Sequence, residues 1–276
     1  MQLMVDSACA ITAELIAAVT GQCGQIGAWG RYLSDGHGAA VPLSAAEVAL
    51  AAEQVLPLLV YANNATGTSV AGRGVTDAWE AIDQAKQLGV PAGTMLCWDL
   101  EYGWPVAQAW IQDVIYAAGE TGYVAGLYGA LAQPYFRLPY ADALRSGYSA
   151  QLVSASWSAS GAEFASGQLP AWAPQIATPE SAAMVVAWQA CRYGTIGGGG
   201  PVDLGVWRGP DQLLWRPAPA PTTIAAPATG ETTAATASPT ATTAVATGHV
   251  TLDAPSAVAD AFSALQTALR SAGLIP

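Results

Sequence analysis

The strongest indication of the fold is the stretch VTDAWEAIDQAKQLGVPAGTMLCWDLE, residues 75–101. Its first half places apolar side chains at helical spacing, which predicts a helix over 75–88. Gly89 and Pro91 then end that helix, because glycine accepts the left-handed conformation after a last turn and proline cannot continue one. The stretch 94–101, which is largely apolar, follows and predicts a strand. The stretch therefore predicts one helix–strand unit of an α/β protein.

The same alternation of strand and helix extends over most of the chain. Ser44 and Glu47 form a capping box that opens a helix reaching about Gln54. Pro105 suits the first turn of a further helix, whereas residues 158–183 are rich in glycine and proline and predict no long helix. Eight strands are predicted, at Leu3–Asp6, Ala28–Leu33, Leu56–Tyr61, Thr94–Glu101, Val124–Tyr128, Gln151–Trp157, Met184–Gln189 and Val202–Trp207.

Eight strands alternating with helices predict an α/β fold of the (β/α)8 TIM-barrel type. A doubly wound open sheet is the alternative. No G-x-G-x-x-G follows the first strand, and the run Gly197–Gly200 precedes a strand instead of opening a helix. The sequence therefore lacks the phosphate-binding turn of the doubly wound folds, and we expect the barrel.

The composition changes abruptly after Trp215. Residues 216–247 consist mostly of Ala, Thr and Pro, which predicts an extended linker. Residues 248–276 regain helical spacing of apolar side chains, with Ser256 as the N-cap. One amphipathic helix needs a partner for its apolar face, so we expect this tail to anchor the protein. The predicted organisation is a barrel over 1–215, a linker and a C-terminal helical tail.

Charge and residue counts exclude several classes of protein. The chain has 20 Asp and Glu against 9 Lys and Arg, a net charge of −11, and 52% apolar residues. Such an acidic chain lacks the basic surface of a nucleic-acid binder. Lys86 is the only lysine, and His37 and His249 are the only histidines. We therefore expect no metal ion and no cofactor, and metal- or nucleotide-dependent enzymes are the least supported class.

Two further expectations concern location and redox state. No apolar run approaches the roughly 18 to 20 residues of a membrane span, and the first six residues lack the basic segment of a secretory signal. We expect neither. The four cysteines have no C-x-x-C spacing and are expected to be free thiols, with a Cys9–Cys23 bridge as the alternative.

The candidate catalytic residues are Asp99 and Glu101, in the sequence Trp98-Asp99-Leu100-Glu101-Tyr102. Alternation along a strand places the two carboxylates on one face, and the carboxyl ends of barrel strands face the active-site mouth. Glycosidic cleavage needs two such groups, one protonated as general acid and one ionised, here framed by Trp98, Tyr102 and Trp104. The alternative is a solvated pair that ends the strand and caps the next helix.

Other predicted strand ends carry side chains that suit a sugar. Each has a structural alternative, such as an N-cap, a turn residue or packing at the rim. A barrel nevertheless directs them to one mouth, and acids ringed by aromatic rings suit a ligand with apolar faces and hydroxyl groups. The candidate substrate-binding residues are Asp6, Asp203, Tyr128, Trp157, Trp188 and Gln189.

The order of these residues resembles a known family. An Asp ends the first strand, W-D-x-E lies on the fourth, aromatic residues on the fifth and sixth, W-Q on the seventh and V-D-L-x-V-W on the eighth. This order resembles the family 25 glycoside hydrolases, which are lysozyme-type muramidases. The stretch Asp83–Gly93 before the W-D-L-E strand is more similar still to the glycoside-hydrolase-like barrels of the Rv2525c-like group. The resemblance covers Met1 to Trp215.

The resemblance implies a role for each candidate. Glu101 would be the proton donor, and Asp99 would position the N-acetyl group of the substrate as the neighbouring nucleophile. Asp6 and Asp203 would complete an acidic floor. Sugar subsites would be lined by Tyr128 and Trp157.

These observations lead to two functional hypotheses. The first is a glycosidase acting on cell-wall peptidoglycan, carried by a phage as an endolysin or a tail-associated enzyme. The second is an inactive barrel that serves as a structural or glycan-binding part of a virion or tail assembly. The linker and the tail helix favour delivery by a particle or a lysis system. The expected locations are therefore the virion, or the host cytoplasm followed by delivery to the cell wall.

Overall fold

The predicted helix–strand unit is present in the computed structural model of the chain. The structure describes residues 1–34, 40–165, 167–195 and 201–219, with the backbone alone for 193–195 and 201. Helix α3 spans Val75–Gln87 and strand β4 spans Met95–Asp99. Both lie within two residues of the prediction, because a long amphipathic stripe and a fully buried run are the clearest periodic signals in a sequence.

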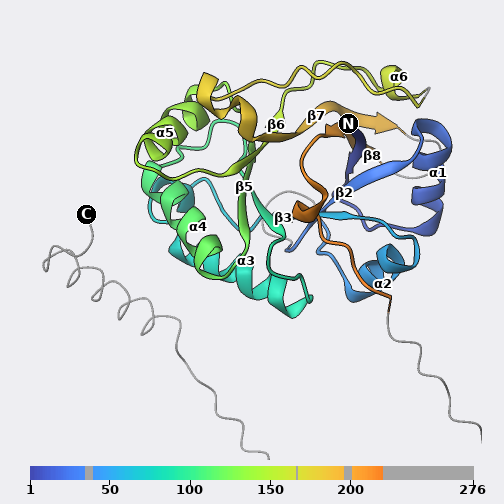
Figure 1. Cartoon of the computed structure of the whole chain (residues 1–276), viewed down its shortest axis with the longest axis horizontal. Coiled ribbons are helices and arrows are strands. Elements are labelled where there is room, and N and C mark those ends of the chain that lie inside the picture. The colour runs from blue at the N-terminus through green and yellow to red at the C-terminus, as the bar shows by residue number, and fades with distance from the viewer. Residues whose placement is uncertain (35–39, 166, 196–200, 220–276) are drawn as a thin grey trace, which may run out of the picture. The chain divides into compact units, whose positions relative to one another are not determined.

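The strands close into a barrel in the order β1-β2-β3-β4-β5-β6-β7-β8, with β8 pairing back to β1 (Figure 1). All eight predicted strands are present, so the TIM-type barrel is confirmed and the open-sheet alternative is wrong. Besides β4, the strands are β1 (Gln2–Asp6), β2 (Ile26–Tyr32), β3 (Leu58–Ala62), β5 (Val124–Gly129), β6 (Gln151–Ala155), β7 (Val185–Thr195) and β8 (Pro201–Trp207).

Strand β8 departs from an all-parallel barrel. Strands β1 to β7 pair in parallel with one another, whereas β8 runs antiparallel to both β7 and β1. Only residues 196–200 separate β7 from β8. A parallel crossover needs a dozen or more residues, so this connection permits only a reversal of direction.

Five helices of nine or more residues occur in the described part of the chain. Ser44 accepts from the backbone N–H of Glu47 and the Glu47 carboxylate reaches back, so the predicted capping box is confirmed. The prediction for Pro105 is wrong, because α4 begins three residues later, after Ala107. Besides α3, the helices are α1 (Ala13–Cys23), α2 (Ala45–Glu53), α4 (Gln108–Glu120), α5 (Pro134–Arg145) and the short α6 (Gly161–Phe164), with 3-10 turns at Ser69–Ala71, Pro179–Met184 and Asp211–Leu213.

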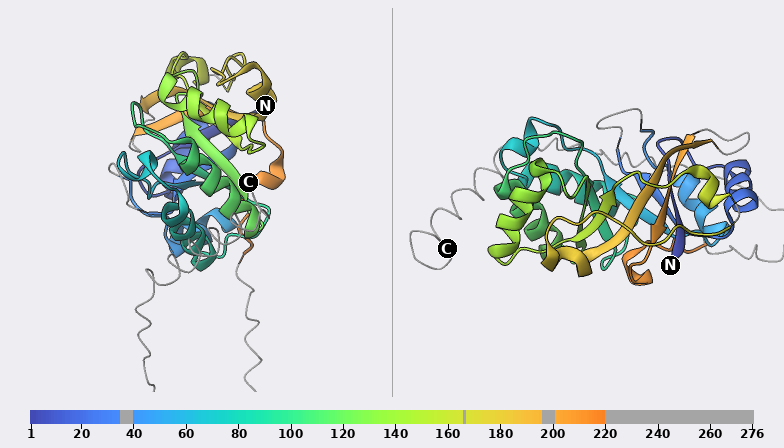
Figure 2. Two further views of the ribbon diagram at one scale, coloured as in Figure 1. Left: turned by 90° about the vertical axis from the view of Figure 1, so that its left-hand side faces the viewer. Right: turned by 90° about the horizontal axis from the view of Figure 1, so that it is seen from above.

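The helices α1 to α5 lie around the outside of the strands (Figures 1 and 2). Between β6 and β7, the described residues form only the single turn α6 and the 3-10 turn at Pro179–Met184, as the glycine and proline content predicts. Trp172 from this stretch packs edge-on against Trp188 of β7 and covers the outer side of that strand. No helix among the described residues is long and apolar enough to cross a bilayer.

The inside of the barrel is filled in layers. A lower layer is apolar and fully buried, and contains Met4, Leu59, Cys97 and Val153. The layer above it, at the carboxyl ends of the parallel strands, contains the polar residues described below. A separate and larger apolar cluster fills the space between the strands and the surrounding helices.

Several predictions fall on residues that the structure does not describe. The tail 248–276, the linker from residue 220 onward, His37 and His249 are all among them. Trp215, at the predicted end of the barrel domain, is buried and pairs with Leu58 of β3 through two backbone hydrogen bonds. The four cysteines are free, so the Cys9–Cys23 bridge is absent.

Candidate active site

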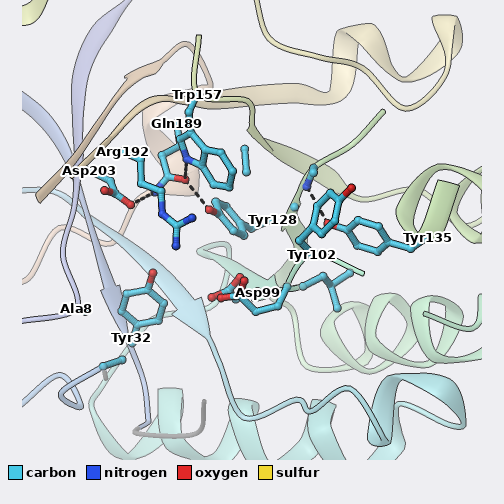
Figure 3. A pocket seen from close by; sticks show the side chains of 16 residues that line it. Ala8, Tyr32, Asp99, Tyr102, Tyr128, Tyr135, Trp157, Gln189, Arg192 and Asp203 are labelled. Atoms are coloured by element: carbon cyan, nitrogen blue, oxygen red, sulfur yellow. Dashed lines mark hydrogen bonds between the residues drawn. The ribbon is translucent and has the colours of Figure 1, made fainter. Parts of the chain in front are cut away.

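A pocket of about 420 Å³ lies at the mouth of the barrel, over the carboxyl ends of the parallel strands (Figure 3). This is the end of a TIM-type barrel at which active sites are found. Its walls combine carboxylates with aromatic rings. The lining includes Tyr32, Asp99, Glu101, Tyr102, Tyr128, Tyr135, Trp157, Gln189, Arg192 and Asp203.

Three carboxylates reach the upper interior layer from strands far apart in the sequence. Asp6 ends β1, Asp99 ends β4, and Asp203 lies near the beginning of β8. In an all-parallel barrel Asp203 would lie at the opposite end. Because β8 runs antiparallel, Asp203 pairs directly with Asp6. The reversal of β8 therefore brings the third acid to the mouth.

Asp99 and Glu101 occupy the same face but different environments. Leu100 between them is buried in the outer apolar cluster, as alternation predicts. The Asp99 side chain is 4% exposed at the end of its strand, whereas Glu101 is exposed on the pocket wall. The pair thus consists of one carboxylate within the barrel and one at the surface that a ligand would cover.

Gln189 organises the polar groups of the upper layer. Its side-chain oxygen accepts from the Tyr128 hydroxyl at 2.5 Å and from the Trp157 indole N–H at 3.0 Å. Its nitrogen donates to Asp203 Oδ2 at 2.7 Å and to Asp6 Oδ2 at 3.5 Å. The amide is 2% exposed, so its orientation is determined by these four partners. It links the acidic floor to the aromatic wall.

Asp6 is the group whose protonation is most affected by the fold. Burial raises its pKa well above the usual range, and the nearby carboxylates of Asp203 and Asp99 raise it further. A 3.4 Å hydrogen bond from the Tyr32 hydroxyl and the charge of Arg31 lower the pKa by less. The fold therefore favours the neutral, proton-bearing form of this carboxyl. No hydrogen-bond partner of its Oδ1 atom is found among the described residues.

Three tyrosines form an aromatic side of the same layer. Tyr32 stacks on Tyr61 with ring centroids 5.3 Å apart, and Tyr61 meets Tyr128 edge-on at 5.7 Å. Burial, followed by neighbouring carboxylates, raises the pKa of all three phenols well above the usual range. They remain hydrogen-bond donors over the whole physiological pH range. Gly30 makes this stacking possible, because a Cβ there would lie 2.5 Å from the Tyr61 ring.

The rim of the pocket is aromatic and continues into a second hollow. Trp157 is 44% exposed and Tyr102 is more exposed still, with its ring edge-on to Tyr135. A second hollow of about 380 Å³ shares Tyr102, Ala130, Ala155 and Trp157 with the first pocket. The two hollows adjoin at these exposed rings and are together called the groove, an arrangement that suits an extended ligand.

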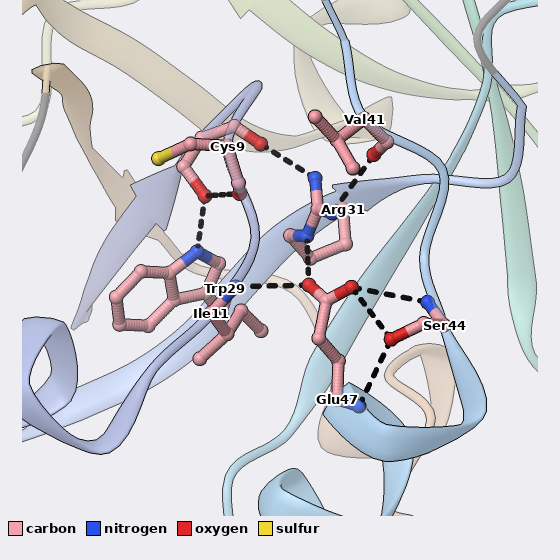
Figure 4. Close-up of polar contacts among 8 residues, drawn as sticks. Cys9, Ile11, Trp29, Arg31, Val41, Ser44 and Glu47 are labelled. Carbon is pink, nitrogen blue, oxygen red and sulfur yellow. Dashed lines mark hydrogen bonds and ion pairs between the residues drawn. The ribbon is translucent and has the colours of Figure 1, made fainter.

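A buried ion pair holds two loops of the rim in place (Figure 4). Arg31 Nε contacts Glu47 Oε1 at 2.8 Å, and both side chains are almost fully buried. The other Arg31 nitrogens donate to the backbone oxygens of Ser7 and Val41, while Glu47 accepts from the backbone N–H of Ile11. These contacts join the loop after β1 to the loop after β2. Both loops contribute to the pocket wall, through Ala8 and Ala40.

The structure brings most of the predicted site residues together. Trp188 is the exception, because its side chain points out of the barrel, is 2% exposed and donates to the Ser156 backbone oxygen. Side chains alternate between the two sides of a strand, so the neighbour of the inward-facing Gln189 must face outward. The prediction that Trp188 lines the pocket is corrected for this reason. Trp98 also lies in the outer cluster and does not frame the site. The residues that meet at the mouth are Asp6, Asp99, Glu101, Tyr128, Trp157, Gln189 and Asp203.

The sequence analysis missed three pocket residues, Tyr32, Tyr135 and Arg192. Tyr32 was accessible to the strand-end rule, because Ala28, Gly30 and Tyr32 share the inward face of β2. Arg192 was not accessible to this rule, because it lies three residues after the inward-facing Gln189 and strict alternation would turn it outward.

Comparisons with known proteins bear on the fold. No protein-family model matches the chain, and no curated protein matches it either. An uncharacterized protein of B. stearothermophilus is similar in structure, with a TM-score of 0.66 and 24% identity over 78% of this chain and 100% of that one. The Tat-secreted protein Rv2525c of Mycobacterium tuberculosis, solved in complex with L-tartrate, gives a TM-score of 0.55 and 14% identity over 78% and 98%.

The catalytic domain of endolysin ply40, from bacteriophage P40 of Listeria monocytogenes, is more distant. Its TM-score is 0.41, with 18% identity over 77% of this chain and 95% of that domain. The likeness to the B. stearothermophilus and Mycobacterium tuberculosis proteins establishes a shared barrel fold alone, and nothing is argued from the endolysin domain. The function has to be argued from the site.

Proposed function

We propose that this protein is a glycosidase that cleaves a bacterial cell-wall glycan, with Glu101 as the proton donor. The observation that carries the proposal is the convergence of Asp6, Asp99 and Asp203 with Glu101 at one aromatic-lined mouth. Glycosidic cleavage requires carboxyl groups in two protonation states around the scissile bond. Aromatic rings beside them suit the apolar faces of sugar rings.

The proposed reaction divides the work between the two carboxylates of β4. Glu101 protonates the glycosidic oxygen as the bond to the anomeric carbon breaks. Asp99 orients the substrate's N-acetyl group, whose carbonyl oxygen bonds to that carbon on the opposite face. Water then opens this intermediate and returns a proton to Glu101. A glycan over Tyr102 and Trp157 would cover Glu101 and remove water from it, which favours the protonated form of a carboxyl.

The groove indicates a chain and not a single sugar as the substrate. The two hollows share Trp157 and Tyr102, so sugar units on either side of these rings would lie in one continuous site. A polymer with repeating N-acetylated sugars, such as peptidoglycan, has the length and the chemistry that this site would bind.

The test is muropeptide release from purified peptidoglycan, with a pull-down on the same cell walls. Wild type is expected to release new reducing ends and to bind the walls. Glu101→Gln is expected to bind them equally but to release reducing ends at least about 100-fold more slowly, because the group acts in the transition state. Binding by both proteins without release would instead favour a glycan-recognition barrel on a particle. Trp157→Ala is the matched variant that is expected to weaken binding itself.

A further inference from the structure

The hydroxyl group of Tyr135 differs from those of the other two half-buried tyrosines that line the pocket. The Tyr32 and Tyr128 hydroxyls donate to side-chain oxygens of the upper layer, at 3.4 and 2.5 Å, so their protons are held within the protein. The Tyr135 oxygen instead accepts a hydrogen bond, from the backbone N–H of Ala130 at 3.2 Å. No acceptor for the Tyr135 O–H itself is found among the residues that the structure describes.

The surrounding chain holds the Tyr135 ring in one position. Tyr135 is the second residue of α5, directly after Pro134, whose ring suits the first turn of a helix. Its ring packs edge-on against Tyr102 with centroids 5.6 Å apart. Its oxygen reaches back to Ala130, the residue after β5, and Figure 3 shows this contact at the pocket wall. Because the Ala130 N–H occupies one side of the oxygen, the phenol hydrogen lies on another side.

This hydroxyl keeps its proton throughout the physiological pH range. Burial raises the pKa of Tyr135 to about 12, and the hydrogen bond from Ala130 lowers it by less. The charges of Glu101 and Asp99, which line the same pocket, raise the pKa further. A neutral hydrogen-bond donor therefore lies at the same wall as the two carboxylates to which the proposed function assigns the chemistry.

The acetamido group of an N-acetylated sugar has two polar ends. Its N–H needs an acceptor, and the proposed function gives that end to Asp99. Its carbonyl oxygen needs a donor, which an ionised carboxylate cannot supply because such a group only accepts. The Tyr135 O–H is a donor at the same pocket wall.

We propose that the Tyr135 hydroxyl donates a hydrogen bond to the carbonyl oxygen of the substrate's acetamido group, which makes this tyrosine a specificity-determining residue for N-acylated sugars. The inference rests on the proposed function and adds how the site recognises the acetamido group. A carbonyl oxygen has two lone pairs. One accepts from Tyr135 while the other bonds to the anomeric carbon, so the contact lasts through the proposed reaction.

The test uses two soluble ligands that differ only at the carbonyl atom. The first is a peptide-free peptidoglycan tetrasaccharide, and the second is the same compound with thioacetamido groups in place of its acetamido groups. Sulfur accepts a hydrogen bond more weakly than oxygen, and the N–H end is retained. Both ligands are titrated calorimetrically into Glu101→Gln, so that turnover consumes little of either. The quantity of interest is the ratio of the two affinities, acetamido over thioacetamido.

Substitutions on the Glu101→Gln background assign this ratio to one hydroxyl group. Tyr135→Phe keeps the ring and removes the donor, so the ratio is expected to fall about three- to tenfold, as for a hydrogen bond between neutral groups. Any difference between the N–H ends of the two ligands is the same in both proteins and cancels. Tyr123→Phe is the matched control, because the Tyr123 hydroxyl donates to the Val90 backbone oxygen at 2.8 Å and does not line the pocket.

An affinity ratio that is unchanged by Tyr135→Phe would overturn the inference. An equal fall of the ratio with Tyr123→Phe would do the same, because it would place the effect outside the pocket. Failure of the Glu101→Gln protein to bind either compound would overturn both the inference and the proposed function. A ratio that falls as expected, with no reducing ends released from cell walls by wild type, would contradict the proposed catalysis alone.

Discussion

The two interior layers of the barrel differ in what they contribute. The lower layer, with Met4, Leu59, Cys97 and Val153, is apolar and fully buried, so it contributes free energy of folding. The upper layer holds Asp6, Asp99 and Gln189 at similar depth, beside the half-buried Asp203, and the desolvation of the Asp6 carboxyl costs free energy of folding. Under the proposed function, the upper layer does the chemistry and the lower layer does not. Substitutions in the two layers should therefore separate activity from stability.

The largest expected effect is on activity and comes from the rim above the upper layer. Glu101→Gln should lower the rate of glycan cleavage by roughly 100-fold to 10,000-fold, the usual contribution of a general acid. The free energy of unfolding should change by about 0.5 kcal/mol or less, because the side chain is exposed. Reducing-end assays and urea denaturation measure the two quantities. Glu120→Gln, another exposed glutamate at the end of α4, should leave both unchanged.

The next largest effect comes from the lower layer, and it is on stability instead of activity. Met4→Ala removes a fully buried side chain from the barrel interior and should lower the free energy of unfolding by roughly 2–5 kcal/mol. Urea denaturation at 25 °C measures this loss. Leu138→Ala, on the exposed side of α5, is the control and should cost far less. Equal losses at the two positions would contradict the layered core.

A smaller loss is expected at Gly205 of β8, where backbone and side-chain atoms of neighbouring strands leave no room for a Cβ. A Cβ there would lie 2.4 Å from the Trp188 backbone oxygen and 2.7 Å from Met4 Cε. Gly205→Ala should therefore destabilise the protein by roughly 1–3 kcal/mol. Gly21→Ala, in α1 with no atom near the added methyl, should instead stabilise it by roughly 0.5–1 kcal/mol. Thermal unfolding of the two variants would show shifts of opposite sign.

The smallest expected effect concerns the pH dependence of stability. Folding raises the pKa of Asp6 above its ordinary 3.8, so the folded protein holds this proton more tightly than the unfolded chain. The resulting stabilisation is present at low pH and is lost as the pH rises toward and through the folded-state pKa. Asp6→Asn removes this loss and should raise the free energy of unfolding at neutral pH by about 1 kcal/mol or more.

Melting temperatures of wild type and Asp6→Asn between about pH 4 and pH 8 test this statement. The wild type should lose stability over this range relative to the variant. Asparagine keeps an oxygen that accepts from Tyr32 and Gln189, so the comparison isolates the titrating proton. Parallel curves for the two proteins would contradict a raised pKa at Asp6.

The fold was predictable because its signals are periodic and local. Buried runs marked all eight strands, and a capping box marked the beginning of α2. The antiparallel direction of β8 was not predicted, although the glycine run after Arg192 leaves too few residues for a parallel crossover. Helix α4 begins later than Pro105 suggests, because Ala107 is still extended and its backbone N–H donates to the backbone oxygen of Val70.

The site residues were predictable only where they lie at the ends of predicted strands. Asp6, Asp99 and Asp203 were found because each lies at the end of a strand that faces the mouth. Trp188 was predicted to line the pocket together with its neighbour Gln189, although adjacent residues of a strand face opposite sides. Arg192 depends on a bulge, and the pKa of Asp6 depends on neighbours from distant strands, so neither follows from local sequence.

The central claim is that the upper layer and its rim hydrolyse a glycan. The most direct test digests purified peptidoglycan in water enriched in oxygen-18, with immediate borohydride reduction and mass spectrometry of the products. The proposed reaction predicts one oxygen-18 atom at each new reducing end from wild type, and new ends at least about 100-fold more slowly from Glu101→Gln. Walls that bind the wild-type protein but yield no labelled reducing ends would contradict the claim.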